Sequence, residues 1–308
     1  MLEQRLVEQV AAALQTTPGL VEKDWQVTRA IGVLAGLDHG AATPAFGGGT
    51  SLSKAWGLIK RFSEDIDFKV AMPPGLSRNK ARDERGAYRE RVLSALTAAG
   101  FTLDTAPRKR DENRFFSADL FYPGLFDPGQ GLRPHIRVEM SLVAPALPSI
   151  DRPVGSLMTA VQGQPPEVTA FPCVDPVETA ADKLSALAWR VRARRRESPN
   201  DDPRIVRHLH DLAALKAAAV ASAQFVPLVL QARAADEGRG GETSASSSTP
   251  LLFAGMLERL STDPLWAVEY EQFVNLTSFA RPDEQIGFAD ALAAVRDLVE
   301  LFQTVEFD

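Results

Sequence analysis

The stretch from Phe46 to Val70 reads FGGGTSLSKAWGLIKRFSEDIDFKV. Three glycines follow a short apolar strand predicted at 44–46, and glycine lets a backbone adopt unusual dihedral angles and approach a phosphate closely. A helix is expected over 52–60, with one of the two hydroxyl residues before it as its N-cap and its first N–H groups directed at an anion. The candidate nucleotide-binding residues are Gly48, Gly49, Thr50 and Ser51.

Two aspartates follow in the next predicted strand, over 66–70. Residues two apart in a strand share a face, so Asp65 and Asp67 point the same way while Ile66 and Phe68 point into the core. Neighbouring carboxylates repel each other unless a cation joins them, and Mg²⁺ typically takes one or two carboxylates together with substrate phosphates. The loop is not a Walker A motif, because no glycine precedes Lys54. A glycine turn or an aspartate alone is more often structural, but this order and spacing favour a metal-dependent active site.

A third carboxylate lies on the clearest strand of the sequence, predicted over 135–143. Apolar residues alternate there with polar ones, and Glu139 is on the polar face. If this strand pairs with the strand of Asp65 and Asp67, Glu139 completes a carboxylate triad that holds metal. If it does not, Glu139 is a solvent-facing strand residue.

The composition limits the class of protein. The chain has 308 residues, a net charge of -6 and a single cysteine, Cys173, which excludes an internal disulfide framework and a thiolate zinc cluster. The N-terminal segment carries acidic residues, unlike a signal peptide, and no apolar run is long enough to cross a bilayer. We expect a soluble cytoplasmic protein without a membrane partner.

The order of the patterns predicts an α+β protein in two parts. A small mixed sheet with flanking helices is expected over 1–160, and an α-helical domain over 161–308. The boundary is set by a Pro-, Gly- and Ser-rich region at 145–172, and helices are expected at 176–196 and 203–235 among others. Composition predicts a flexible loop near 236–250.

One basic cluster stands out in this acidic chain. Residues 190–196 read RVRARRR at the end of a predicted helix. Such a cluster can bind a phosphate-rich partner, although a charged helix face is more often simply solvated. The candidate RNA-binding residues are Arg190, Arg192, Arg194, Arg195 and Arg196.

The segments GGGTSL and RFSEDIDF resemble the signature of the AbiEii/MenT nucleotidyltransferase toxins, within the DNA polymerase β-like nucleotidyltransferase superfamily. VEKDW (21–25) resembles a segment common before that signature, and DKLSAL (182–187) and RIVRHLHDLAAL (204–215) resemble later family motifs. The resemblance implies a polymerase β-like nucleotidyltransferase domain followed by a helical domain.

It also implies chemistry and partners. The enzyme would use Mg²⁺, or Mn²⁺ in its place, to transfer NMP from an NTP to an RNA acceptor, with tRNA expected. This would inhibit translation, and a cognate antitoxin would be its protein partner. Glu139 would activate the attacking hydroxyl or support a second metal, Lys183 would contact the nucleotide, and Asp211 would pair with Lys183. Modification of Ser51 would silence the enzyme.

Three other interpretations remain open. The acceptor can instead be a protein or a small-molecule hydroxyl. A phosphohydrolase based on His210 and Asp211 is disfavoured, because such enzymes need more histidines converging on metal and the only others, His39 and His135, are in unsuitable contexts. His208 and His210 do not share a helix face, so a metal site formed by this pair is not expected, and both are expected on the surface. A catalytically inactive binding protein is disfavoured by the two intact aspartates.

Overall fold

The chain divides into two compact units, Met1–Asp175 and Pro176–Asp308. The computed structural model describes residues 2–103, 105–127, 129, 132–199, 201–237 and 248–302. The Pro-rich region where the sequence suggested a boundary contributes two strands and a helix to the first unit. Residues 238–247, which carry most of the flexible loop expected near 236–250, lie outside the described residues.

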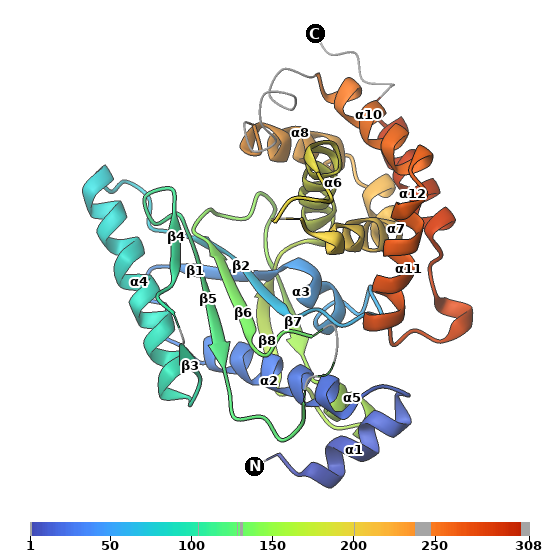
Figure 1. Cartoon of the computed structure of the whole chain (residues 1–308). Helices are drawn as coiled ribbons and strands as arrows, with labels where there is room; N and C mark the ends of the chain where they lie inside the picture. Colours follow the sequence, from blue (N-terminus) through green and yellow to red (C-terminus); the bar gives the residue numbers. More distant parts are fainter. Residues whose placement is uncertain are drawn as a thin grey trace. The chain divides into compact units, whose positions relative to one another are not determined.

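The first unit contains a mixed eight-stranded sheet (Figure 1). Its strands are β1 (Thr43–Gly47), β2 (Asp65–Ala71), β3 (Thr102–Leu103), β4 (Arg108–Arg110), β5 (Phe115–Phe121), β6 (Ile136–Ser141), β7 (Ile150–Val154) and β8 (Val168–Cys173). They run in the order β3-β5-β6-β2-β1-β8-β7, with β4 beside β5. At the centre, β2 is antiparallel to β1 and parallel to β6. The mixed sheet expected from the sequence is confirmed, and β4, β7 and β8 are additions to it.

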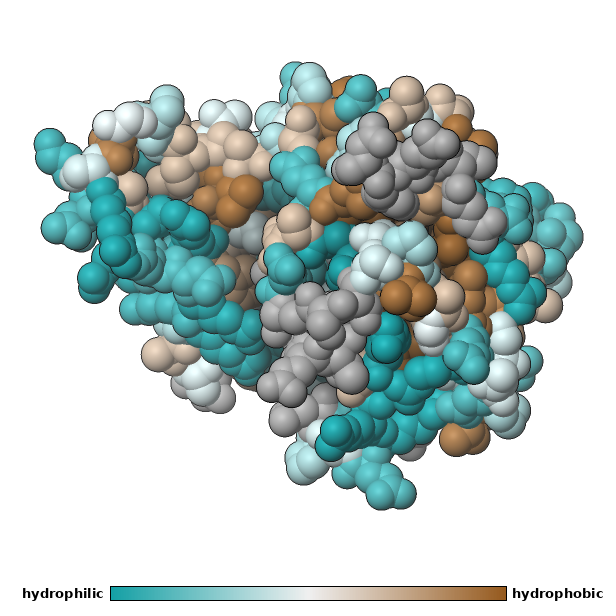
Figure 2. All heavy atoms as spheres, turned by 90° about the horizontal axis from the view of Figure 1, so that it is seen from above, coloured by the Kyte–Doolittle hydropathy of each residue, from teal (hydrophilic) through white to brown (hydrophobic). Residues whose placement is uncertain are grey.

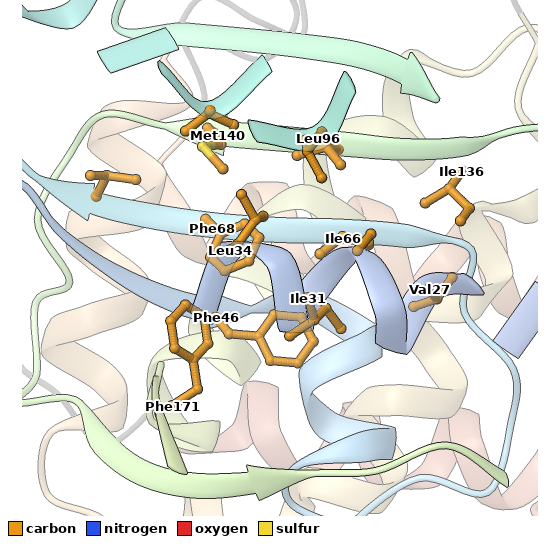
Figure 3. Packing of buried hydrophobic residues seen from close by; sticks show 14 of the residues in the cluster. Val27, Ile31, Leu34, Phe46, Ile66, Phe68, Leu96, Ile136, Met140 and Phe171 are labelled. Atoms are coloured by element: carbon orange, nitrogen blue, oxygen red, sulfur yellow. The ribbon is translucent and has the colours of Figure 1, made fainter. Parts of the chain in front are cut away.

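Two helices, α2 (Pro18–Ala35) and α4 (Arg78–Ala98), cover one face of this sheet and form the hydrophobic core with it. The helices of the unit are α1 (Gln4–Ala13), α2 (Pro18–Ala35), α3 (Gly48–Lys54), α4 (Arg78–Ala98) and α5 (Leu157–Gln162). Figure 3 shows Ile31 and Leu34 of α2 beside Phe46, Ile66 and Phe68 of the sheet. Because strand residues alternate between faces, burying Ile66 and Phe68 turns their neighbours to the other face.

The outer face of α4 is strongly charged. Its buried side includes Tyr88, Val92 and Leu96, whereas residues 78–84 are half-buried or exposed and mostly charged. Figure 2 shows a largely hydrophilic surface on the side of the molecule where α4 lies. This division into a buried and a charged side is that of an amphipathic helix.

The second unit is helical, as expected. Its elements are α6 (Pro176–Ala193), η1 (Pro203–Val206), α7 (Arg207–Ala221), α8 (Phe225–Ala235), α10 (Thr249–Thr262), α11 (Leu265–Thr277), η2 (Pro282–Glu284) and α12 (Phe288–Glu300). The single helix expected over 203–235 was wrong, because the chain breaks after Ala221 and begins a new helix at Phe225. In the described part of the chain, no helix is both long and apolar enough to cross a membrane.

Candidate active site

Three carboxylates share the face of the sheet that α2 and α4 leave uncovered. Asp65 and Asp67 alternate with buried residues on β2, and the parallel register places Asp67 directly beside Glu139 of β6. Paired residues on adjacent strands project to the same side. The pairing on which the triad interpretation depended is therefore present, and Glu139 lies beside the aspartates.

The glycine loop is shaped around Asp67. Gly48 has φ +68°, and a Cβ at this position would lie 2.7 Å from Cγ of Asp67 and closer still to its Oδ2. A Cβ on Gly49 would lie 2.8 Å from Nη2 of Arg61 and 3.0 Å from Oγ of Ser63. These glycines are required first for packing, because the Asp67 carboxylate and the Arg61 side chain occupy the space of the missing side chains.

The helix after the glycines differs from the prediction. It spans Gly48–Lys54 instead of 52–60, and its N-cap is Gly47, so neither Thr50 nor Ser51 caps it. Thr50 donates from its hydroxyl to the main-chain carbonyl of Asp65 and so ties the loop to the start of β2. Ser51 is 1% exposed. Modification of Ser51, which the resemblance implies, would require this helix to move.

Asp65 is paired with an arginine that the sequence interpretation did not single out. Nη2 of Arg133 donates a hydrogen bond to Oδ2 of Asp65 at 3.3 Å, and Nη1 lies 3.0 Å from Oδ1. Only the Nη2–Oδ2 contact has hydrogen-bond geometry, and the Nη1–Oδ1 contact is a close pairing of charges without a hydrogen bond. Arg133 precedes β6, and nothing in the periodicity of the sequence distinguishes it from other loop arginines.

The charged run inside α2 has a role that the sequence resemblance did not specify. Glu22, Lys23 and Asp24 are all buried. Glu22 accepts hydrogen bonds from the N–H groups of residues 125 and 126, and Asp24 pairs with Lys54 at 2.5 Å. Lys23 forms an ion pair with Glu64, and burial lowers its pKa although Glu64 opposes the shift. The signal available in the sequence was three consecutive charges in an otherwise apolar helix.

A second arginine on the same face is held elsewhere. Arg137 lies opposite Asp65 in the register, but it donates to both oxygens of Asp119 on β5, at 2.7 and 3.1 Å. Burial raises the pKa of Asp119, but the hydrogen bonds and charge of Arg137, together with the charges of His135 and Arg108, outweigh it, and the net shift is downward. Arg137 therefore neutralises Asp119, and Arg133 makes the direct ion pair with Asp65.

The fit of this face to a metal ion is partial. The donors are carboxylate oxygens on neighbouring strands, which is the chemistry that Mg²⁺ prefers. Among the described residues, however, no three His, Cys, Asp or Glu side chains converge closely enough to hold a metal ion. Asp65, Asp67 and Glu139 share a face but do not form a preassembled triad, and Asp65 faces Arg133.

The second unit contains the predicted lysine and aspartate as a buried pair. Nζ of Lys183 on α6 lies 2.7 Å from Oδ2 of Asp211 on α7, and Asp211 is 0% exposed. The surface position expected for the histidines was wrong, because His208 and His210 are both buried. Burial lowers the pKa of His208 well below its ordinary value. Two helix faces that pack against each other thus bring these groups together.

The predicted basic cluster is largely neutralised within the protein. Arg194 donates to Asp201 at 2.6 and 2.8 Å and to Glu269 at 2.6 and 2.9 Å, and it is buried. Arg196 pairs with Glu269 and Asp263. The side chains of Arg190 and Arg192 are half-buried, and Arg195 is exposed. Arg190 also pairs with Asp202 at 3.5 Å. The cluster is therefore no continuous basic surface, because carboxylates compensate several of its members.

The chain was compared with known proteins. A family model described as "Nucleotidyl transferase AbiEii toxin, Type IV TA system" matches residues 33–299. Among solved structures, MenT4, a nucleotidyltransferase toxin from Mycobacterium tuberculosis H37Rv, is similar with a TM-score of 0.61. That match has 18% sequence identity and covers 99% of this chain and 91% of the other, so it supports the fold. No curated protein sequence is significantly similar.

Proposed function

The chain belongs to the AbiEii family of nucleotidyltransferase toxins of type IV toxin–antitoxin systems, and we propose that it transfers NMP from an NTP to an RNA acceptor, with tRNA as the expected acceptor. Transfer to tRNA would inhibit translation in the cytoplasm, and a cognate antitoxin would counteract it.

One observation carries the proposal for the site: Asp67 lies beside Glu139 on adjacent parallel strands, and Asp65 is on the same face. Asp65, Asp67 and Glu139 would hold Mg²⁺, which when bound supplies positive charge to the triphosphate and its leaving group. The acceptor hydroxyl attacks the α-phosphorus, the bond to the β-phosphate oxygen breaks, and pyrophosphate leaves. Glu139 is suited to accept the proton of the attacking hydroxyl.

The donor nucleotide is assigned to the loop after β1, and the family resemblance adds Lys183 as a proposed nucleotide-binding residue. Asp67 fills the space beside Gly48, so nucleotide phosphates that reach Asp67 also reach the backbone of the glycine loop. Lys183 is held by Asp211, which fixes its ammonium group while leaving two protons for other acceptors. The proposed nucleotide-binding residues remain Gly48, Gly49, Thr50, Ser51 and Lys183.

A polyanionic acceptor is supported by basic residues on the carboxylate face itself. The register leads from Asp67 through Glu139 and Ser117 to Arg108 on β4. Arg108 and Arg110 are exposed, and because they are two residues apart in β4 they share a face. β4 is three strands away from β2, which corresponds to about 14 Å. The two arginines would meet RNA phosphates near the reacting end. Of the original cluster, the exposed Arg195 is the member proposed for contact with RNA.

The acceptor is tested by incubating the protein with Mg²⁺, each α-labelled NTP in turn and separated fractions of tRNA, ribosomal RNA, protein and small metabolites. Label in tRNA, weakened by Arg108→Gln with Arg110→Gln and unaffected by Arg78→Gln, is the expected result. Arg78 is an exposed arginine on α4 that pairs with Glu112. Label in the protein or metabolite fraction alone would contradict the RNA acceptor and retain the nucleotidyltransferase.

A further inference from the structure

We propose that Arg133 binds the donor triphosphate: its guanidinium pairs with Asp65 until the nucleotide and its divalent cation arrive, and then turns to the phosphate oxygens. This inference rests on the proposed function. It adds a nucleotide-binding residue and a switch of partner at Asp65.

The first support is the position of the pair. Arg133 and Asp65 are joined by one hydrogen bond and a second close charge contact, and their side chains are 24% and 27% exposed, so the pair lies at the boundary between protein and solvent. Oδ1 of Asp65 and Nη1 of Arg133 are buried and lack hydrogen-bond partners among the described residues, so an incoming ligand reaches the exposed part of each side chain and can satisfy these atoms once the pair opens. A guanidinium at such a position matches a phosphate as well as it matches a carboxylate, because both accept two parallel hydrogen bonds.

The second support is the way in which the backbone of Arg133 is held. Its N–H donates to Oε2 of Glu64 at 2.7 Å, and its carbonyl accepts from Nζ of Lys23 at 2.5 Å. Lys23 and Glu64 also form an ion pair with each other, and Lys23 is 0% exposed. Two buried charges thus clamp the two successive peptide groups that flank the Cα of Arg133. The clamp fixes where the Arg133 side chain starts and leaves the direction of its guanidinium open.

The third support is the competition for Asp65. The carboxylate oxygens that face Arg133 are those that a divalent cation would take, and a metal ion and a guanidinium repel each other at that distance. A second carboxylate near Arg133 is that of Glu64, whose Oε1 lies 3.8 Å from Nε. Glu64 already accepts from Lys23 and from the Arg133 N–H. Once displaced, the guanidinium has the triphosphate beside the metal as its strongest available partner.

The test measures binding without an acceptor. Calorimetry measures the affinity of the protein for a non-hydrolysable NTP analogue in the presence of Mg²⁺. Electron paramagnetic resonance measures its affinity for Mn²⁺ without nucleotide. Arg133→Gln is expected to lower the affinity for the analogue by roughly tenfold to a hundredfold, which is the size expected when charge-assisted hydrogen bonds are lost. The same variant is expected to bind Mn²⁺ alone more tightly, because the competing cation is gone. A purely structural role predicts no such opposite changes.

Two further variants complete the experiment. Arg133→Lys keeps the charge and loses the planar pair of donors, so its analogue affinity is expected between those of wild type and Arg133→Gln, and it carries the test if Arg133→Gln does not fold. Arg78→Gln is the matched control. The inference would be overturned by an unchanged affinity for the analogue in folded Arg133→Gln or Arg133→Lys. An unchanged affinity for Mn²⁺ in folded Arg133→Gln would also overturn it. Either result would leave the proposed function standing. A wild-type protein that binds no analogue would contradict the proposed function as well.

Discussion

Gly48 and Asp67 are fitted to each other, because the Asp67 carboxylate occupies the space that a Cβ on Gly48 would need. The φ of +68° at Gly48 adds backbone strain for any other residue. Gly48→Ala is therefore expected to displace Asp67 and abolish nucleotidyl transfer.

Gly57 provides the matched control for this prediction. It has φ +64°, and a Cβ there meets no atom within 4 Å. Gly57→Ala is expected to lower the free energy of unfolding by about 1–2 kcal/mol from backbone strain alone and to keep its activity. Transfer rates and thermal unfolding of both variants distinguish strain from the clash. Equal activity of Gly48→Ala and Gly57→Ala would show that the fit to Asp67 is unimportant.

The Lys183–Asp211 pair combines a structural role with a proposed catalytic one. Lys183→Met takes the lysine away from a fully buried carboxylate, so we expect a loss of about 3–5 kcal/mol in the free energy of unfolding. Lys183→Met with Asp211→Leu is expected to restore most of the stability, since two apolar side chains replace the pair. Nucleotide affinity should remain low in this double variant. Wild-type affinity in the stable double variant would remove Lys183 from the site.

Two adjacent arginines separate stability from RNA binding. Arg194 is clamped by Asp201 and Glu269, so Arg194→Gln is expected to cost about 3 kcal/mol of stability. Arg195 is exposed, and Arg195→Gln is expected to leave the unfolding temperature unchanged. If Arg195 contacts RNA, its replacement lowers the salt dependence of binding by about one counter-ion. An unchanged salt dependence would remove Arg195 from the RNA interface.

The buried side chain of His208 is expected to make the free energy of unfolding depend on pH. Its pKa is depressed by burial in the folded state and ordinary in the unfolded state, so the unfolded chain takes up the proton first. Stability is therefore fully present above about pH 6.5 and falls on acidification, by at most about 1.4 kcal/mol per pH unit from this group. His208→Gln is expected to flatten the decline in unfolding temperature between pH 7.5 and 5.5.

His39 and His135 also have pKa values lowered by burial, so they contribute to the decline in the same direction. Part of the slope is therefore expected to persist in His208→Gln. A slope identical to that of the wild type would mean that His208 becomes protonated as readily in the folded protein as in the unfolded one.

The carboxylate face could be predicted from the sequence because strand periodicity is local. Alternation in 135–143 and around Asp65 fixed which side chains share a face, and the structure pairs the two strands in the register that brings Asp67 beside Glu139. The sheet and the helical second part followed from the same local patterns. The helix after the glycines was misplaced because its start depends on the packing of Gly48 against Asp67.

Pairing of charges over long sequence separations could not be predicted. Lys23 meets Glu64, and Arg194 meets Glu269, only after the chain has folded. Periodicity and composition treat such residues as solvated, so the clamp on Arg133 was missed and the basic cluster was overestimated. Buried His208 was misassigned to the surface for the same reason, because its neighbours come from α6 as well as α7.

The most direct test of the central claim compares label at the α-phosphate with label at the γ-phosphate of the NTP, in wild type and in Asp67→Asn. Asparagine keeps the shape of the side chain beside Gly48 and removes the charge. We predict that α-label enters RNA with the wild-type protein, that γ-label does not, and that folded Asp67→Asn transfers neither. Transfer of α-label by Asp67→Asn at the wild-type rate would contradict the assignment of this sheet face as the site of nucleotidyl transfer.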